Sequence, residues 1–175
     1  GDIHHARAQM TFKAFDASNW RASDDVGRWW SLAGVGTHCL DWVRWMLVPV
    51  CGEVCEVGSI ISSGILGSSR DETASINLKF ESGATAQLLS SVLFSGPSRG
   101  EIYGSDGHAI CEDTFGRHGG GVIKTSNGGI NFRQANPYAG EIADFVTSVI
   151  ENRDPEVPGT EGRRNTELLS NISPI

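Results

Sequence analysis

His38 is the residue whose type and position most directly suggest chemistry. It follows two glycines, Gly34 and Gly36, and precedes a segment whose apolar residues recur at three- and four-residue steps. This spacing predicts a helix with His38 at its mouth. Because a helix N-terminus carries about half a positive charge, it favours a neutral imidazole near pH 7, and a neutral ring can accept a proton. The alternative is a structural role, in which the ring caps or packs the start of the helix.

Two further polar features are candidates for a binding site. Asp41 lies three residues after His38, in the first helical turn, where a carboxylate also interacts favourably with the helix dipole. Trp20 and Arg21 place a guanidinium beside an indole, an arrangement suited to a polyol or an anionic group. The alternative for this pair is a surface arginine that rests on a tryptophan.

Other side chains that could bind metal or act as acids lack suitable partners in the sequence. Cys51 and Cys55 have the spacing CxxxC, but no second pair of cysteines or histidines follows at the distance of a zinc finger. The carboxylate pairs Asp71–Glu72 and Glu112–Asp113 fall at the ends of expected strands, where we expect solvated charges. The sequence therefore predicts no metal site.

Three helices are expected to flank the middle of the chain. Apolar spacing predicts a helix over Cys39–Val48, stopped by Pro49. A second is expected over residues 137–152, with Asn136 as its cap, Pro137 at its first position and an apolar stripe on one side. A third follows from Glu161 to Asn171. The stripe of the second helix consists of Ile142, Phe145, Val146, Val149 and Ile150.

Between the first and second helices the sequence has β character and frequent glycine turns. Glycine accounts for 22 of the 175 residues, and this excess is typical of many short strands joined by turns. The resulting expectation is an α+β fold, a largely antiparallel, open-faced β-sheet with helices packed on one face. The expected strands are Ile3–Ala14, Glu53–Ser62, Thr73–Glu81, Ala84–Phe94, Glu101–Gly104, His108–Glu112, Gly121–Thr125 and Ile130–Gln134.

Composition narrows the class of protein. A length of 175 residues predicts a single domain, and the net charge of −7 argues against nucleic acid as a partner. The longest apolar run, Trp42–Cys51, is interrupted by Arg44 and Pro49 and is too short to span a membrane. The sequence shows no secretory leader, and its four cysteines are interpreted as reduced thiols, so we expect a cytoplasmic location. It also lacks the GxGxxG loop of dinucleotide-binding domains.

The order of these motifs resembles the C-terminal domain of the glucose-fructose oxidoreductase / inositol dehydrogenase (Gfo/Idh/MocA) family. Individually the motifs are weak, but their order and spacing cover nearly the whole chain. They are Trp20–Arg21, the segment from Gly36 to Trp42 that is similar to the family's GxHxxD, the hairpin Thr73–Ser91, the turn Tyr103–Gly107, and the closing segments Asn136–Phe145 and Pro155–Gly162.

The resemblance implies a substrate-binding and oligomerisation domain over residues 1–175, with the N-terminal Rossmann domain absent from this chain. It implies an oxidoreductase that uses NAD or NADP, bound mainly by that missing domain and not by this chain, and a sugar, polyol or related small molecule as substrate. His38 would act in proton transfer, and Trp20, Arg21 and Asp41 would contact the substrate. Apolar residues on both faces of the sheet, at Leu88–Leu89 and Val92–Phe94, also favour a homo-oligomer through the open face.

One position departs from the family pattern. The family often has an aspartate four residues before the histidine, and this chain has Gly34 there. Either His38 works with a lysine of the missing domain alone, or Asp41, Asp24 or Asp25 replaces the aspartate, or the reaction is lost or changed. The alternative function is therefore a non-catalytic module that binds a small ligand or dimerises.

Overall fold

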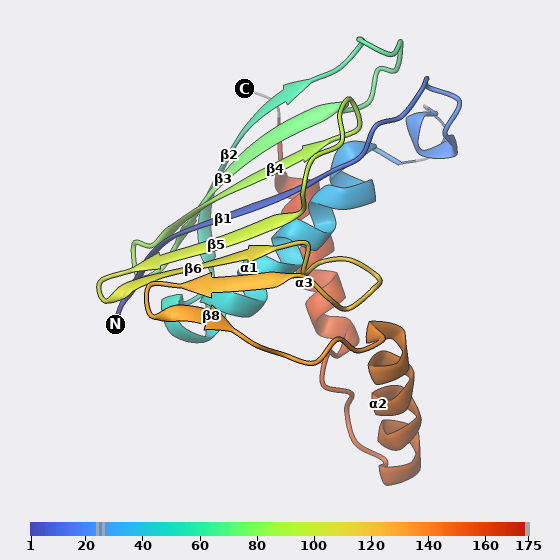
Figure 1. The fold of residues 1–175 in the computed structure, drawn as a ribbon. Coiled ribbons are helices and arrows are strands. Elements are labelled where there is room, and N and C mark those ends of the chain that lie inside the picture. Colours follow the sequence, from blue (N-terminus) through green and yellow to red (C-terminus); the bar gives the residue numbers. More distant parts are fainter. Residues whose placement is uncertain (24, 26, 174–175) are drawn as a thin grey trace.

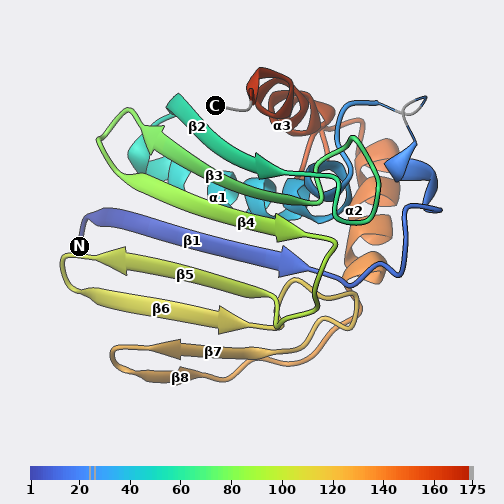
Figure 2. The same ribbon diagram turned by 90° about the horizontal axis from the view of Figure 1, so that it is seen from above.

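The computed structural model describes residues 1–23, 25 and 27–173, and these form one eight-stranded sheet accompanied by helices. The strand order is β2-β3-β4-β1-β5-β6-β7-β8, so the first strand of the chain lies inside the sheet, as Figure 2 shows. β1 pairs in parallel with β4, and the other pairings of the described strands are antiparallel. The predicted fold class is confirmed, with a mixed sheet. The strands are β1 (Ile3–Thr11), β2 (Val54–Ser62), β3 (Thr73–Phe80), β4 (Thr85–Ser91), β5 (Arg99–Gly104), β6 (Gly107–Glu112), β7 (Val122–Thr125) and β8 (Gly128–Ile130).

One face of the sheet is apolar and carries two helices, α1 (Thr37–Cys51) and α3 (Gly159–Asn171) (Figure 1). Alternation along β3 buries every second side chain, as expected for a strand with one covered face. From the other side, α1 contributes apolar residues at helical spacing, and α3 packs its last turn against the same core. The centre of this core contains Ala6, Ala8, Leu40, Val43, Leu47, Ile76, Leu78, Phe80 and Leu88.

The structure corrects several predicted boundaries. α1 does not stop at Pro49 but continues to Cys51, because a proline in the last turn removes only one backbone donor. The helix ends at Gly52, which has a φ of 77° that favours glycine and donates its N–H to the Val48 carbonyl. β8 covers Gly128–Ile130 instead of Ile130–Gln134, because its pairing with β7 ends at Ile130. None of the helices in the described residues has both the length and the apolar character needed to cross a bilayer.

The opposite, open face of the sheet is mainly polar. Of the apolar runs predicted to lie on both faces, Leu88 points into the core and Val92 is buried in a second cluster with Trp30, whereas Phe94 is 42 % exposed. At the centre of the open face, Glu101 is only 7 % exposed. It accepts hydrogen bonds from Tyr103 Oη at 2.6 Å and from Arg99 Nε at 2.5 Å. Contrary to the expectation of a merely solvated charge, Glu112 also pairs with Arg99, at 3.0 Å.

The Glu101 network predicts a specific pH dependence of stability. Burial raises the pKa of Glu101, but the hydrogen bonds from Tyr103 and Arg99 and the Arg99 charge outweigh it, so the pKa lies below its ordinary value of 4.5. A lowered pKa means that this carboxylate stabilises the fold above pH 4.5 and that its contribution is lost as the pH falls through the lowered value. Glu101→Gln should therefore lower the urea midpoint of unfolding at neutral pH. Below pH 4.5 the midpoint of this variant should fall less steeply with decreasing pH than that of the unmodified protein.

The control for this prediction is Glu56→Gln. Glu56 is highly exposed and pairs with Lys79 at 3.6 Å, so removing its charge should change the urea midpoint little at any pH. If Glu101→Gln and Glu56→Gln have the same acid profile as the unmodified protein, the Glu101 network does not contribute to stability.

Helix α2 (Pro137–Glu151) stands apart from the sheet, below and to the right in Figure 1. Its predicted start is confirmed, because Asn136 Oδ1 accepts a hydrogen bond from the Tyr138 amide at 3.0 Å and Pro137 occupies the first turn. The segment that leads into it is held by Gly119, which has a φ of 60° and whose carbonyl accepts a hydrogen bond from the Ala135 amide at 3.3 Å. A Cβ at Gly119 would lie 1.6 Å from the Ala135 carbonyl oxygen, so only glycine fits this contact.

Candidate functional site

The helix that carries His38 starts earlier than the sequence predicts. A π-helical segment, η2 (Leu32–Gly36), continues directly into α1, with helical backbone angles at Gly36 and Thr37. His38 therefore lies in the second turn of a continuous helix, several residues from the helix N-terminus, where the dipole carries its positive charge. Because the dipole's effect falls off within the first turn, the predicted electrostatic reason for a neutral His38 is wrong. A π-helical turn next to this residue is nevertheless a feature often found at functional sites.

Asp71 anchors the start of this helix. Its carboxylate accepts hydrogen bonds from the Trp30 amide at 2.5 Å, the Ser31 hydroxyl at 2.5 Å and the Leu32 amide at 2.7 Å. The side chain is 2 % exposed, so the expectation of a solvated charge is wrong. Burial raises the pKa of Asp71, and the three hydrogen bonds act against that increase. The carboxylate takes the role of an N-cap from a loop residue that is distant in the sequence and lies just before β3.

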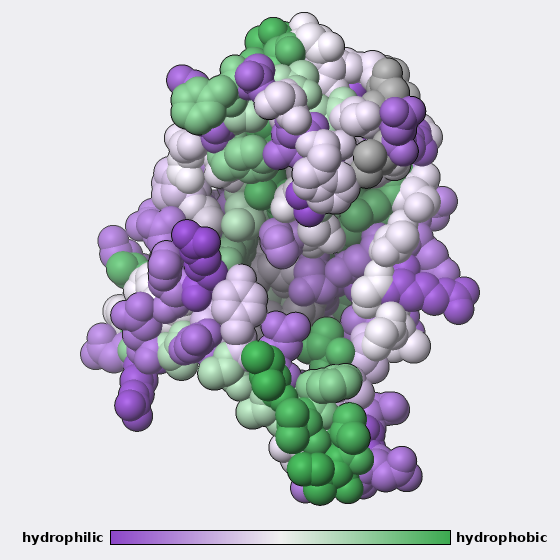
Figure 3. Space-filling model, turned by 90° about the vertical axis from the view of Figure 1, so that its right-hand side faces the viewer, coloured by the Kyte–Doolittle hydropathy of each residue, from purple (hydrophilic) through white to green (hydrophobic). Residues whose placement is uncertain are grey.

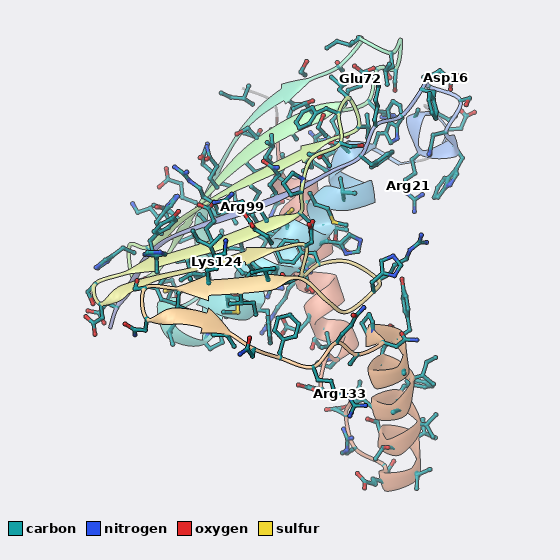
Figure 4. The ribbon with its side chains drawn as sticks, in the orientation of Figure 1. Asp16, Arg21, Glu72, Arg99, Lys124 and Arg133 are labelled. Carbon is teal, nitrogen blue, oxygen red and sulfur yellow. The ribbon has the colours of Figure 1, made fainter. Side chains whose placement is uncertain are left out.

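Glu72 is also buried, contrary to expectation. Its carboxylate accepts hydrogen bonds from the Ile65 amide at 2.7 Å and the Leu66 amide at 2.8 Å, and the residue is fully enclosed. Figure 4 shows Glu72 at the end of the sheet that also carries the loop with Asp16 and Arg21. The Asp71–Glu72 pair therefore fixes two loops at that end of the sheet.

His38 and Asp41 lie on one exposed side of α1. Residues three apart on a helix share a face, and Trp45, 70 % exposed, continues that face by one more turn. Within the described residues the His38 ring has no hydrogen-bond or ion-pair partner. Asp41 Oδ1 accepts a hydrogen bond from Asn165 Nδ2 of α3 at 2.7 Å, so α3 orients this carboxylate. Asp41 does not lie in the first helical turn, because η2 precedes α1.

Trp20 and Arg21 form a separate element, η1 (Trp20–Ala22). The Arg21 guanidinium lies 4.1 Å from the centre of the Trp20 ring, which is the stacked arrangement named above as the alternative. Asn19 Oδ1 accepts from the Arg21 amide, and Ser68 Oγ donates to the Ala22 carbonyl, so the turn is anchored. Among the described residues, no carboxylate pairs with the Arg21 guanidinium. Figure 4 shows this side chain extending away from its loop.

These elements share one side of the molecule without forming a closed pocket. η1, η2 and the start of α1 lie at the right of Figure 1, and no contact within the described residues joins Trp20 or Arg21 to His38 or Asp41. Of the candidate replacements for the family aspartate, Asp24 lies outside the described residues and the Asp25 carboxylate contacts no described histidine. A Cβ at Gly34 would meet only a Phe12 ring carbon, at 3.8 Å, so the backbone there accepts a residue with a Cβ.

The described residues hold no group of three or more His, Cys, Asp and Glu side chains that could bind a metal. The four cysteines are unpaired, and burial raises the pKa of the Cys39 thiol to about 12. A hollow of about 540 Å³ lies along the β7–β8 hairpin, where Ile123, Ile130 and Phe132 line it. It contains none of the candidate site residues.

Asp71 is the residue of this region that sequence reasoning missed. Its three hydrogen-bond donors lie 39 to 41 positions earlier in the chain. No local pattern connects them, since the carboxylate follows a loop and precedes a strand. The sequence offers no signal for this contact, because Ser31, the residue immediately before η2, is itself of a type that caps helices.

Comparison with known proteins identifies the family. The model described as GFO/IDH/MocA C-terminal domain matches residues 1–110, and the chain therefore belongs to the Gfo/Idh/MocA family. No curated protein sequence matches the chain. Its fold is similar to many solved structures, and the three described next share 16 % to 18 % sequence identity with it.

Three of these structures illustrate the likeness. Aldose-aldose oxidoreductase from Caulobacter crescentus, complexed with glycerol, has 18 % identity and a TM-score of 0.87 over 97 % of this chain and 52 % of its own. UDP-N-acetylglucosamine 3-dehydrogenase GnnA from Acidithiobacillus ferrooxidans has 17 % identity and a TM-score of 0.75, over 98 % of this chain and 53 % of its own. The WlbA dehydrogenase from Bordetella pertussis, in complex with NADH and UDP-GlcNAcA, has 16 % identity and a TM-score of 0.68, over 97 % of this chain and 50 % of its own. The chain thus spans about half the length of these oxidoreductases.

Proposed function

We propose that this chain is the substrate-binding half of an NAD- or NADP-dependent oxidoreductase that acts on a sugar, a polyol or a related small molecule. Family membership supports the oxidoreductase class, and the similar structures include enzymes described with NADH, glycerol or a nucleotide sugar. The nicotinamide cofactor belongs to an N-terminal Rossmann domain outside these 175 residues. The chain itself supplies side chains to the substrate.

The observation that carries this proposal is the exposed His38 on a helix that Asp71 fixes in place. A histidine with no partner among the described residues, held by a rigid helix, is free to exchange a proton with a bound hydroxyl or carbonyl group. Asp41, oriented by Asn165, lies on the same side of α1 and can accept a hydrogen bond from a sugar hydroxyl. The Arg21–Trp20 stack offers a cation and an aromatic face to the same class of ligand.

The test uses the complete protein encoded by the gene. Purified protein is mixed with NAD or NADP and a panel of aldoses, polyols and nucleotide sugars, and the nicotinamide absorbance is followed. Turnover with at least one of them is expected, and the His38 variant discussed below then tests the assignment of the proton-transfer residue. Absence of both cofactor binding and turnover would contradict the proposal.

Gly34 favours a second candidate function. It replaces the aspartate that many family members have four residues before the histidine, although a Cβ at this position would meet no close neighbour. A chain without this carboxylate fits a non-catalytic module that binds a small ligand or dimerises. In the assay above, ligand binding without turnover would support this second candidate.

We also propose that the protein forms a homo-oligomer through the open face of the sheet. Within the described residues nothing covers this face, and Arg99 and Glu112, whose side chains are 39 % and 36 % exposed, present both charge signs there, which suits a self-complementary contact. Sedimentation velocity of the complete protein at micromolar concentration should show an oligomer. A clean monomer under these conditions would contradict the proposal.

A further inference from the structure

The apolar stripe of α2 lies on the outside of the molecule. Exposure of its five side chains ranges from 48 % at Val146 to 77 % at Ile150, with Phe145 at 64 %. Figure 3 shows a continuous hydrophobic surface over this helix. Soluble domains seldom leave an apolar helix face of this extent in water, and such faces usually mark an interaction site.

The opposite side of α2 is the one that the rest of the chain holds. Asp144 accepts hydrogen bonds from Arg153 Nη2 and from the Glu156 amide, both at 2.8 Å, and Ser148 is 4 % exposed. At the other end, the Gly119–Ala135 contact fixes the segment that enters the helix. These contacts leave the apolar stripe facing outward, which is the reverse of an ordinary amphipathic helix.

The size of the stripe indicates what kind of partner covers it. A helix of 15 residues is about 22 Å long and about 10 Å wide, so its face offers about 220 Å², whereas a stable interface needs about 800 Å² per partner. The α2 helix of a second copy would therefore not suffice. The occupant must extend past α2 onto neighbouring surface, as a whole domain does.

We propose that the stripe of α2 is the docking surface for the half of the same polypeptide that lies outside these 175 residues, the nucleotide-binding domain. The proposal rests on the proposed function. It is supported by the comparisons, in which this chain matches over almost its full length but covers only 50 % to 53 % of the similar oxidoreductases. α2 lies on the same, right-hand side of the molecule as Arg21 and the start of α1, the helix that carries His38 (Figures 1 and 4).

The experiment measures thiol labelling in the complete protein. Val149→Cys places a thiol in the stripe, and Glu151→Cys places one on the other side of the same helix as a matched control. The side chains replaced are similarly exposed in this structure, at 67 % for Val149 and 56 % for Glu151. Both variants carry Cys55→Ser, which removes an exposed native thiol. We expect a maleimide to react at least tenfold more slowly at position 149 than at position 151, independently of protein concentration.

The possible outcomes separate this proposal from the proposed function. Equal labelling rates at the two positions would overturn the docking surface. Protection of position 149 that disappears on dilution would also overturn it and would identify a second copy as the occupant. Cofactor binding is measured on the same preparations. Concentration-independent protection without NAD(P)H binding upholds the docking of the same polypeptide and contradicts only the nucleotide-dependent function.

Discussion

The complete protein with His38→Asn should lose turnover by about 10²- to 10⁴-fold, the range that a positioned general acid or base contributes. Asparagine has a similar size and polarity but does not titrate near neutral pH, so it removes proton transfer and leaves the helix intact. The affinity for the nicotinamide cofactor, measured by fluorescence titration, should be unchanged. Such a split between turnover and cofactor affinity is expected of a residue that acts on the substrate and not on the nucleotide.

The matched control is His4→Asn. His4 is exposed on β1, and it has no part in the proposed site. His4→Asn should retain full turnover. If His38→Asn also retains full turnover while its circular dichroism and melting temperature are normal, the catalytic assignment is wrong and the non-catalytic function becomes the better account.

Asp71→Ala should give a large loss of stability. The substitution leaves the buried amides of Trp30 and Leu32 without their acceptor, and the Ser31 hydroxyl keeps only Ser90 Oγ, at 3.0 Å; each unsatisfied amide costs about 1 to 3 kcal/mol. We expect the free energy of unfolding to fall by about 3 kcal/mol. For a domain of this size that corresponds to a drop in melting temperature of roughly 10 °C, measured by calorimetry.

Two variants calibrate this result. Asp71→Asn retains one acceptor oxygen and should lose less than Asp71→Ala. Asp154→Ala removes an exposed carboxylate near the end of α2 and should change the free energy of unfolding by less than about 0.5 kcal/mol. Equal stability of Asp71→Ala and Asp154→Ala would show that the carboxylate does not hold the start of the helix.

Local signals accounted for much of the fold. The start of α2 was predictable to the residue because Asn136 and Pro137 act on the turn immediately next to them. The hairpin between β3 and β4 was equally predictable. Two strands that alternate buried and exposed residues flank Gly83, whose φ of 91° favours glycine. Interactions within a few residues leave a readable pattern in the sequence.

The features that sequence reasoning missed depend on distant contacts. The backbone amides that donate hydrogen bonds to the Asp71 carboxylate lie about 40 positions earlier in the chain. The extension of α1 through η2 follows from this capping. Likewise, the spacing of Ile142, Phe145 and Val149 shows that α2 has an apolar side but not which side the rest of the chain holds. For the site, the residue types of His38 and Arg21 were readable, whereas their surroundings were not.

The place of β1 in the sheet has a consequence for folding kinetics. β2, β3 and β4 form one run of neighbouring antiparallel strands, and β5 to β8 form another, so each run can assemble from contacts close in sequence. β1 joins the two runs, and its parallel pairing places His5 opposite Thr85, 80 positions later in the chain. β1 must therefore wait until β4 and β5 have been made, and the closing of this long loop is expected to limit the folding rate of this domain.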